Sequence, residues 1–210
     1  MTNQGGSPRL ILASGSPRRA ELLTRLGLVF QVVPSDVPED EMEGESPAAH
    51  AERLSREKAS KVSRAYPDAL VLAGDTVVVR DGVLLGKPRD VEEAAAMLSS
   101  LEGRTHTVIS GLALAPPKGI IRSGSLATEV TFRPFDKDFA LLYAETGEPM
   151  DKAGAYGIQG LGSALVERIS GDYHTVMGLP IPLLLDLLEG CGWRYQFGEL
   201  LPESGSSGHG

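Results

Sequence analysis

The fold is decided by residues 9–33, which read RLILASGSPRRAELLTRLGLVFQVV. The stretch Arg9–Ala13 predicts a short buried strand, and Leu28–Val33 predicts a second one. Between them a Ser-Pro pair begins a helix with an apolar stripe, and Gly27 ends it. A strand, a helix and a strand in this order indicate a parallel crossover unit. The loop after the first strand then lies at the carboxyl end of a strand, where open α/β sheets bind ligands.

The rest of the chain continues to alternate between strands and helices. We expect further helices at 47–65, 90–101, 136–144 and from about 179 onward. We expect further strands at 71–73, 77–80, 83–85, 105–115, 120–132 and 165–169, with an Asp-Gly turn between the second and third of them. No segment repeats, so the prediction is an α/β fold: a mixed sheet with flanking helices that forms two lobes around a cleft. Residues 9–200 are expected to form this single domain, with a disordered N-terminus (residues 1–8) and a disordered tail (residues 201–210).

The composition limits the classes of ligand and the compartment. The 210-residue chain is 41% hydrophobic, enough for a core, and its 20 basic and 28 acidic residues give a formal charge of -8. This charge gives no general attraction to nucleic acids or anionic membranes, so an anionic ligand needs a locally basic pocket. With one cysteine, no signal peptide and no apolar run of membrane-spanning length, we expect a cytoplasmic protein that binds neither nucleic acid nor membrane.

A candidate anion site follows the first strand. Ser14 and Ser16 precede a proline at the first helical position, and Arg18 and Arg19 follow in the first turn. Free N–H groups, the positive end of the helix dipole and two guanidinium groups together suit a phosphate. The alternative is an ordinary Ser-Pro helix start with both arginines solvated. Because cations at a helix N-terminus cost up to about 1 kcal/mol, the arginine pair favours a bound anion.

Two lysines and a carboxylate occur at unusual positions. Lys58 falls on the expected buried stripe of the 47–65 helix, so its ammonium either reaches the surface along the helix or points into a cleft that holds phosphate. Asp75 and Thr76 follow an apolar run, where an acid is costly unless it binds a metal or does chemistry; the alternative is a structural Asp in a turn. Lys87 follows the predicted hairpin, whose antiparallel strands bring it back toward Asp75.

A glycine-rich loop offers the last candidates. Residues 152–160 read KAGAYGIQG and combine the cation of Lys152, the ring of Tyr156 and the amide of Gln159 with glycines that allow close backbone approach. The amide can both donate to and accept from the edge of a base, and the ring can stack on it. The histidines are scattered without the spacing of metal ligands, so zinc is not expected.

Six short blocks occur in a fixed order along the chain: SGSPRR (14–19), EKA (57–59), GDT (74–76), GKP (86–88), KAGAYGIQG (152–160) and GLP (178–180). Together they resemble the Maf family of nucleotide pyrophosphatases, over residues 10–197. The resemblance implies a fold similar to that of inosine triphosphate pyrophosphatases, with a cleft for one nucleoside triphosphate. It also implies dependence on a divalent metal and, as in many members, a homodimer.

The motifs resemble those of the branch that acts on dTTP and UTP. The resemblance therefore implies a nucleoside triphosphate diphosphatase, a hydrolase acting on acid anhydrides, with Asp75 as the proton acceptor. It links Arg18, Thr76 and Gln159 to substrate choice. Glu39 matches an acidic position of the family, and the neighbouring residues 40 and 41, also acidic, are the alternatives.

Hydrolysis at the α-phosphorus needs a neutralised triphosphate, a water in line with the leaving pyrophosphate, and a base. The cations expected to hold phosphate oxygens are Arg18, Arg19, Lys58, Lys87 and Lys152. Mg²⁺ or Mn²⁺, which prefer oxygen ligands, would bridge the phosphates to Asp75 and Glu39. Two alternatives remain open: the branch of the family that prefers 7-methyl-GTP, and a nucleotide-binding regulator of septum formation without useful turnover.

Overall fold

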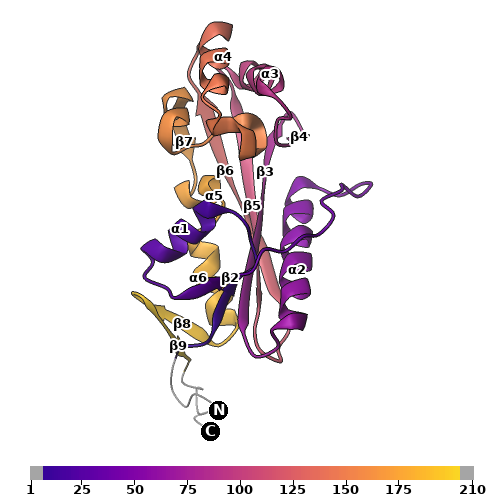
Figure 1. The fold of residues 1–210 in the computed structure, drawn as a ribbon, viewed down its shortest axis with the longest axis vertical. Coiled ribbons are helices and arrows are strands. Elements are labelled where there is room, and N and C mark those ends of the chain that lie inside the picture. The colour runs from indigo at the N-terminus through magenta and orange to yellow at the C-terminus, as the bar shows by residue number, and fades with distance from the viewer. Residues whose placement is uncertain (1–6, 204–210) are drawn as a thin grey trace.

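A seven-stranded mixed sheet forms the centre of the molecule (Figure 1). The structure is a computed structural model that describes residues 7–203. Its strands are β1 (Leu10–Leu12), β2 (Phe30–Val32), β3 (Leu70–Arg80), β4 (Val83–Leu85), β5 (Thr105–Ala115), β6 (Arg122–Phe132), β7 (Val166–Ser170), β8 (Trp193–Gln196) and β9 (Glu199–Pro202). Its α-helices are α1 (Pro17–Arg25), α2 (Pro47–Ala65), α3 (Val91–Leu101), α4 (Lys137–Glu145), α5 (Tyr173–Met177) and α6 (Ile181–Gly190). The 3-10 helices are η1 (Glu148–Asp151), η2 (Ala153–Ala155) and η3 (Gly160–Leu165).

The N-terminal crossover unit forms as predicted. Strand β1 pairs in parallel with β2 on one side and with β3 on the other. Pro17 fits the first turn of α1, where a backbone N–H would have no helical partner, and Leu22 and Leu23 are buried in the core below the sheet. Gly27 ends the helix with a φ of +74°, which glycine adopts without strain. The loop of residues 13–16 therefore lies at the carboxyl end of β1.

Strand β3 is longer than the sequence predicted. We expected strands at 71–73 and 77–80, separated at Gly74-Asp75-Thr76, but β3 runs unbroken through these residues. The expected break is absent because residues 71–79 pair continuously with β5. On its other edge, β3 pairs with β1 over residues 70–72 and with β4 over residues 78–80. Between these two stretches the structure describes no partner strand, so Asp75 and Thr76 lie at an opening in the sheet.

Alternation along β3 sends these two polar side chains to opposite faces. Asp75 faces α2, where it contacts Lys58, and Thr76 faces α1, where it contacts Arg19. Helix α2 comes very close to the sheet at Gly111 of β5, which is paired with Asp75. A Cβ at that glycine would lie 2.4 Å from a backbone carbonyl oxygen of α2, so only glycine allows this approach.

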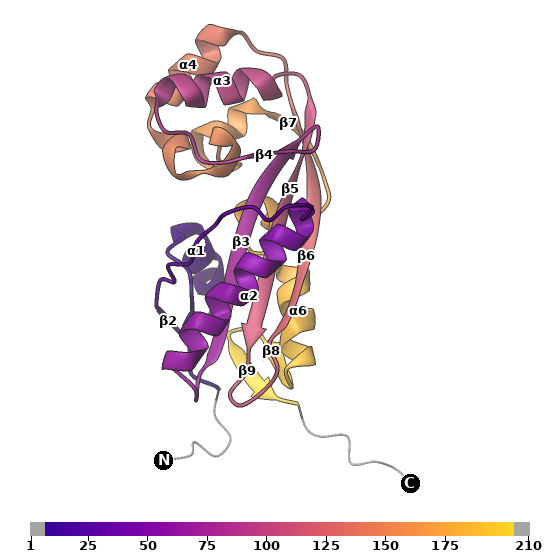
Figure 2. The ribbon, with the colours of Figure 1, turned by 90° about the vertical axis from the view of Figure 1, so that its right-hand side faces the viewer.

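Helices gather at the two ends of the long strands β3, β5 and β6 (Figure 2). The first lobe contains β1, β2, α1, α2, α6 and the β8–β9 hairpin; the second lobe contains β4, α3, α4 and the 3-10 helices. Each lobe has a main cluster of buried apolar side chains, one that includes Leu72 and Leu112 and one that includes Phe132 and Tyr143, and Val166 and Val176 pack against both clusters. The predicted fold class, a mixed sheet with flanking helices and two lobes, is confirmed.

Three elements near the C-terminus were not predicted. Helix α5 has only five residues and begins after the cap Asp172, so it is too short to leave a periodic apolar pattern. Strands β8 and β9 form a hairpin that turns at Phe197-Gly198, which is not a common turn pair. Leu201 and Pro202, which the sequence places in the expected tail, are the end of β9.

The predicted disordered ends fall largely outside the described residues. Of the segments 1–8 and 201–210, the structure describes only residues 7–8 and 201–203. Among the helices in the described part, none is both long and apolar enough to cross a membrane.

Candidate active site

A cleft of about 830 Å³ opens between the two lobes, beside the unpaired edge of β3. Every residue that the sequence suggested for the site lines this cleft: Ser14, Ser16, Arg18, Arg19, Glu39, Lys58, Asp75, Thr76, Lys87, Lys152 and Gln159. The structure therefore brings together candidates from both lobes and from six separate segments of the chain. The role of each residue remains a prediction.

Arg19 is a buried cation with neutral partners. Its side chain donates to the carbonyl oxygen of Gly178 at 2.8 Å, to Ser14 Oγ at 2.9 Å and to Thr76 Oγ1 at 2.9 Å. Burial lowers the pKa of Arg19, and the nearby charge of Asp75 partly offsets this. Among the described residues, no carboxylate forms an ion pair with it. A buried charge without a paired counter-ion is costly, which favours an anion in the adjoining cleft.

The hydroxyl of Thr76 is held by a chain of hydrogen bonds. It accepts from Arg19, and it lies 2.8 Å from Ser110 Oγ, which itself donates to the carbonyl oxygen of Thr175 at 2.7 Å. Since the proton of Ser110 goes to that carbonyl, Thr76 donates to Ser110. The hydroxyl thus has only acceptor capacity left for a ligand. Ser110 is fully buried on β5, and the sequence gave no sign of this contact.

Lys58 joins two carboxylates at the face of α2. Its ammonium donates to Asp75 Oδ1 at 2.7 Å and to Glu39 Oε1 at 2.6 Å. Lys58 is 8% exposed and Asp75 is 9% exposed, so this pair lies away from bulk water, whereas the side chain of Glu39 is half-exposed. Burial would raise the pKa of Glu39, but the hydrogen bond and charge of Lys58 outweigh it and lower the pKa. Lys58 is therefore not a solvated lysine at the surface but lines the cleft, and its role in holding phosphate stays a prediction.

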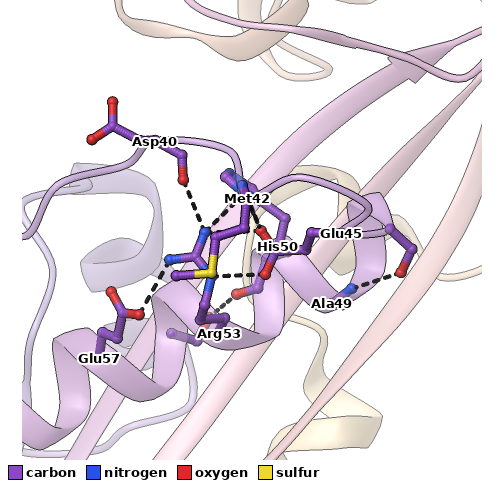
Figure 3. A network of polar contacts seen from close by, with 10 residues as sticks. Asp40, Met42, Glu45, Ala49, His50, Arg53 and Glu57 are labelled. Atoms are coloured by element: carbon purple, nitrogen blue, oxygen red, sulfur yellow. Dashed lines mark hydrogen bonds and ion pairs between the residues drawn. The ribbon is translucent and has the colours of Figure 1, made fainter.

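A network around Arg53 of α2 anchors the loop that carries Glu39 (Figure 3). The guanidinium donates to both carboxylate oxygens of Glu45, at 2.7 and 2.9 Å, and to the carbonyl oxygen of Asp40 at 2.9 Å. His50 also contacts Glu45, at 3.1 Å. The hydrogen bonds from Arg53 lower the pKa of Glu45 to about 2. The loop is thereby tied to the helix that also supplies Lys58.

An ion-pair bridge crosses the cleft between the lobes. Asp151 of η1 lies 3.1 Å from Nη1 of Arg18 in α1 and 2.6 Å from Nζ of Lys152. Burial would raise the pKa of Asp151, but the hydrogen bond from Lys152 and the charge of Arg18 lower it. The ionised carboxylate of Asp151 therefore lies between Arg18 and Lys152, two cations that the sequence predicted to bind phosphate.

The glycine-rich loop places one amide in the cleft. Gln159 is partly exposed there, whereas Tyr156 is 5% exposed and packs into the core of the second lobe, with its hydroxyl 2.8 Å from Nε2 of His106. The ring of Tyr156 is therefore engaged with protein side chains. Lys152 and Tyr156 of this loop both have side-chain partners, whereas the amide of Gln159 makes no hydrogen bond with the described residues.

The acidic residues of the cleft fit a divalent cation that is shared with a ligand. In the described part of the chain, no three Asp, Glu, His or Cys side chains come close enough to hold a metal by themselves. Asp75 and Glu39 do converge on one ammonium, so two carboxylates lie close together. Mg²⁺ is commonly held by one or two carboxylates together with phosphate oxygens, and this donor set suits that arrangement.

Two acidic residues of the cleft were missed by sequence reasoning. Glu148 and Asp151 line it and lie just before Lys152. A signal was available, since an acid directly beside a proposed phosphate-binding lysine needs a partner of its own. Their partners, however, include backbone groups and an arginine 133 residues away, which no local pattern specifies.

A family model, related sequences and a solved structure are similar to this chain over most of its length. The family model described as Maf-like protein matches residues 9–191. The dTTP/UTP pyrophosphatase of Deinococcus radiodurans is 49% identical over 89% of this chain and 94% of its own length. The dTTP/UTP pyrophosphatase of Moorella thermoacetica is 50% identical over 86% of this chain and 93% of its own length. Among solved structures, the Staphylococcus aureus Ham1 protein shares the fold with a TM-score of 0.51 at 15% identity, covering 87% of this chain and 98% of that one.

Proposed function

The chain belongs to the family of Maf-like proteins, and from this premise we propose that it is a cytoplasmic pyrophosphatase that converts dTTP and UTP to the monophosphate and pyrophosphate. The names of the relatives support the substrate, because the alignments cover most of both chains. The single cysteine suits the reducing compartment.

The observation that carries the proposal is that a buried cation and a buried carboxylate lie at the same opening in the sheet, on opposite faces of β3. Arg19 brings a buried positive charge to one side of β3, where none of residues 7–203 supplies it with a carboxylate partner. Asp75 brings a buried negative charge to the other side. An anion-binding group and a carboxylate base at adjoining positions are what hydrolysis of a phosphoanhydride requires.

Asp75 is the proposed base. Lys58 donates to its Oδ1, and no described residue donates to its Oδ2, so this second oxygen can take a proton from water. The water then attacks the α-phosphorus, the bond from that phosphorus to the bridging oxygen breaks, and pyrophosphate leaves. The hydrogen bond from the ammonium of Lys58 holds the carboxylate of Asp75 in place for this task.

The phosphates are proposed to bind along the cations of both lobes. We expect a triphosphate to replace the carboxylate of Asp151 between Arg18 and Lys152, because its oxygens carry more charge than one carboxylate. Arg19 and the exposed Lys87 add positive charge to the same cleft. A divalent cation held by phosphate oxygens with Asp75 and Glu39 would neutralise the charge that develops on the leaving pyrophosphate.

The products and the base preference test the proposal. The protein, supplied with Mg²⁺ or Mn²⁺, should convert dTTP and UTP to the monophosphate with one pyrophosphate per turnover. The measurement is a panel of nucleoside triphosphates that includes 7-methyl-GTP, with pyrophosphate and orthophosphate quantified separately.

Other outcomes of the panel would overturn different parts of the proposal. Orthophosphate with a nucleoside diphosphate would indicate attack at the γ-phosphorus. Faster turnover of 7-methyl-GTP would assign the chain to the other branch. Tight binding of dTTP without turnover would favour the nucleotide-binding regulator.

A further inference from the structure

We infer that Glu148 is a positioning residue for base recognition: with Tyr143 it holds the segment 157–162 so that Gln159 stays at the cleft. The inference rests on the proposed function, because it needs a nucleotide base to be recognised. Glu148 begins η1, and Tyr143 belongs to α4, so both come from the second lobe.

Three backbone N–H groups near Gln159 donate hydrogen bonds to the carboxylate of Glu148 or to the hydroxyl of Tyr143. The Oε2 atom of Glu148 accepts from the N–H of Leu161 at 3.0 Å, and its Oε1 atom accepts from the N–H of Gly162 at 3.0 Å. The hydroxyl of Tyr143 donates to Oε1 of Glu148 at 2.9 Å and accepts from the N–H of Gly157 at 3.1 Å. The anchored groups therefore lie on both sides of Gln159 in the chain.

Hydrogen bonds of a regular helix or strand do not hold these N–H groups. Residues 157–159 belong to no helix or strand, and the N–H groups of Leu161 and Gly162 lie in the first turn of a 3-10 helix, which leaves them without helical acceptors. Glu148 supplies the acceptor for both N–H groups, of which that of Gly162 is partly buried and that of Leu161 is exposed. Its side chain thus replaces secondary structure.

Two glycines of the segment leave the room that Glu148 and Tyr143 need to reach the backbone. Gly160 has a φ of +65°, and a Cβ there would lie 2.7 Å from Oε2 of Glu148. A Cβ at Gly162 would lie 2.5 Å from the hydroxyl oxygen of Tyr143. Side chains at either position would push the carboxylate and phenol away from the backbone.

Glu148 is ionised in this environment. Burial would raise its pKa, but the N–H groups of Gly162 and Leu161 and the hydroxyl of Tyr143 outweigh burial and lower it. A charged acceptor makes stronger hydrogen bonds than a neutral one. Since the lone pairs are directed at these three donors, the carboxylate holds the loop rather than the substrate.

The consequence concerns selectivity between bases. With its neighbours fixed, Gln159 meets the base edge in one conformation, with a φ of -94° and a ψ of 169°. A loop that loses these anchors samples other conformations and weakens the contact with the preferred base. The contacts of Asp75 and Lys58, made by other elements, remain intact.

Glu148→Gln is the most selective test, because it keeps the size of the side chain and one side-chain oxygen that can accept; the contact of Lys152 is with the backbone carbonyl oxygen of Glu148 and is not altered. An amide nitrogen cannot accept from a backbone N–H, so one anchor is lost. We expect kcat/KM for UTP to fall about tenfold, on the scale of one lost hydrogen bond to a charged group. For CTP, which differs at the edge of the base, we expect a much smaller change. Tyr143→Phe should have the same direction of effect and serves if Glu148→Gln does not fold.

A double-mutant cycle with Gln159→Ala gives the sharper readout. If Glu148 acts through Gln159, then Glu148→Gln should change the ratio of UTP to CTP turnover little once Gln159 is Ala. Additive losses, or equal losses for both nucleotides, would overturn the inference. Tyr195→Phe and Glu93→Gln are matched controls, because they remove a hydroxyl donor and a carboxylate acceptor outside the cleft.

Hydrogen exchange separates this inference from the proposed function. In the nucleotide-free protein, Glu148→Gln should accelerate exchange at the amides of residues 157, 161 and 162 while the melting temperature stays close to that of the parent. Unchanged exchange would overturn the anchoring role, even in an active enzyme. Failure of the parent protein to hydrolyse UTP would instead overturn the proposed function.

Discussion

Replacing Asp75 with Asn should lower kcat by roughly 10²–10⁴-fold, the usual range for loss of a general base. The asparagine keeps an Oδ1 that can accept from Lys58, so the geometry seen at 2.7 Å can persist while the proton acceptor is lost. Binding should survive. Removing a carboxylate from a cleft that holds phosphate also removes repulsion, so the affinity for dTTP without metal should be unchanged or higher.

Asp81→Asn is the matched control for this variant. Asp81 lies at the turn between β3, the strand that carries Asp75, and β4, outside the cleft. Its φ of +51° is one that asparagine also tolerates. Turnover and calorimetric titration of both variants separate chemistry from binding. An Asp75→Asn protein with turnover within a few-fold of the parent would remove Asp75 from the mechanism.

Replacing Lys58 with Met should lower kcat/KM by at least about tenfold, equivalent to about 1.4 kcal/mol. Methionine keeps the aliphatic stem on the buried face of α2 but removes the ammonium that joins Asp75 to Glu39. The two carboxylates then repel each other, and phosphate binding loses a cation. Lys137→Met, at an exposed position of α4, is the control for the loss of one charge.

The pH profile gives Lys58 a second signature. In the parent, Lys58 holds the pKa of Glu39 below its ordinary value against the effect of burial. Without the lysine, burial still raises that pKa, and only the more distant charges of Lys87 and Arg19 oppose it. The acidic limb of the kcat/KM profile should therefore move to higher pH. An unchanged profile with full activity would mean that the ion pairs of Lys58 are structural only.

Local signals account for most of what the sequence predicted. The Ser-Pro start of α1 and its end at Gly27 are specified within a few residues, and they place the anion loop at the end of β1. Lys58 was informative for a similar reason, since a charge on a buried stripe conflicts with the helical pattern. Its position in the cleft was predicted, whereas its pairing with two carboxylates was not.

Long-range contacts account for what the sequence could not specify. Gly74-Asp75-Thr76 suggested a break in the strand, yet pairing with β5 carries β3 through these residues. Whether Asp151 meets Arg18, or Glu148 meets Leu161, depends on how the two lobes close and how the loop folds back. These contacts follow from tertiary structure, and residue types alone leave many partners possible.

The most direct test of the central claim is the position of oxygen transfer. The reaction is run with UTP in water enriched in heavy oxygen, and the products are analysed by mass spectrometry. Attack at the α-phosphorus in this cleft predicts one heavy oxygen in UMP and none in pyrophosphate. Heavy oxygen in pyrophosphate, or in orthophosphate, would show attack at another phosphorus and would contradict the account.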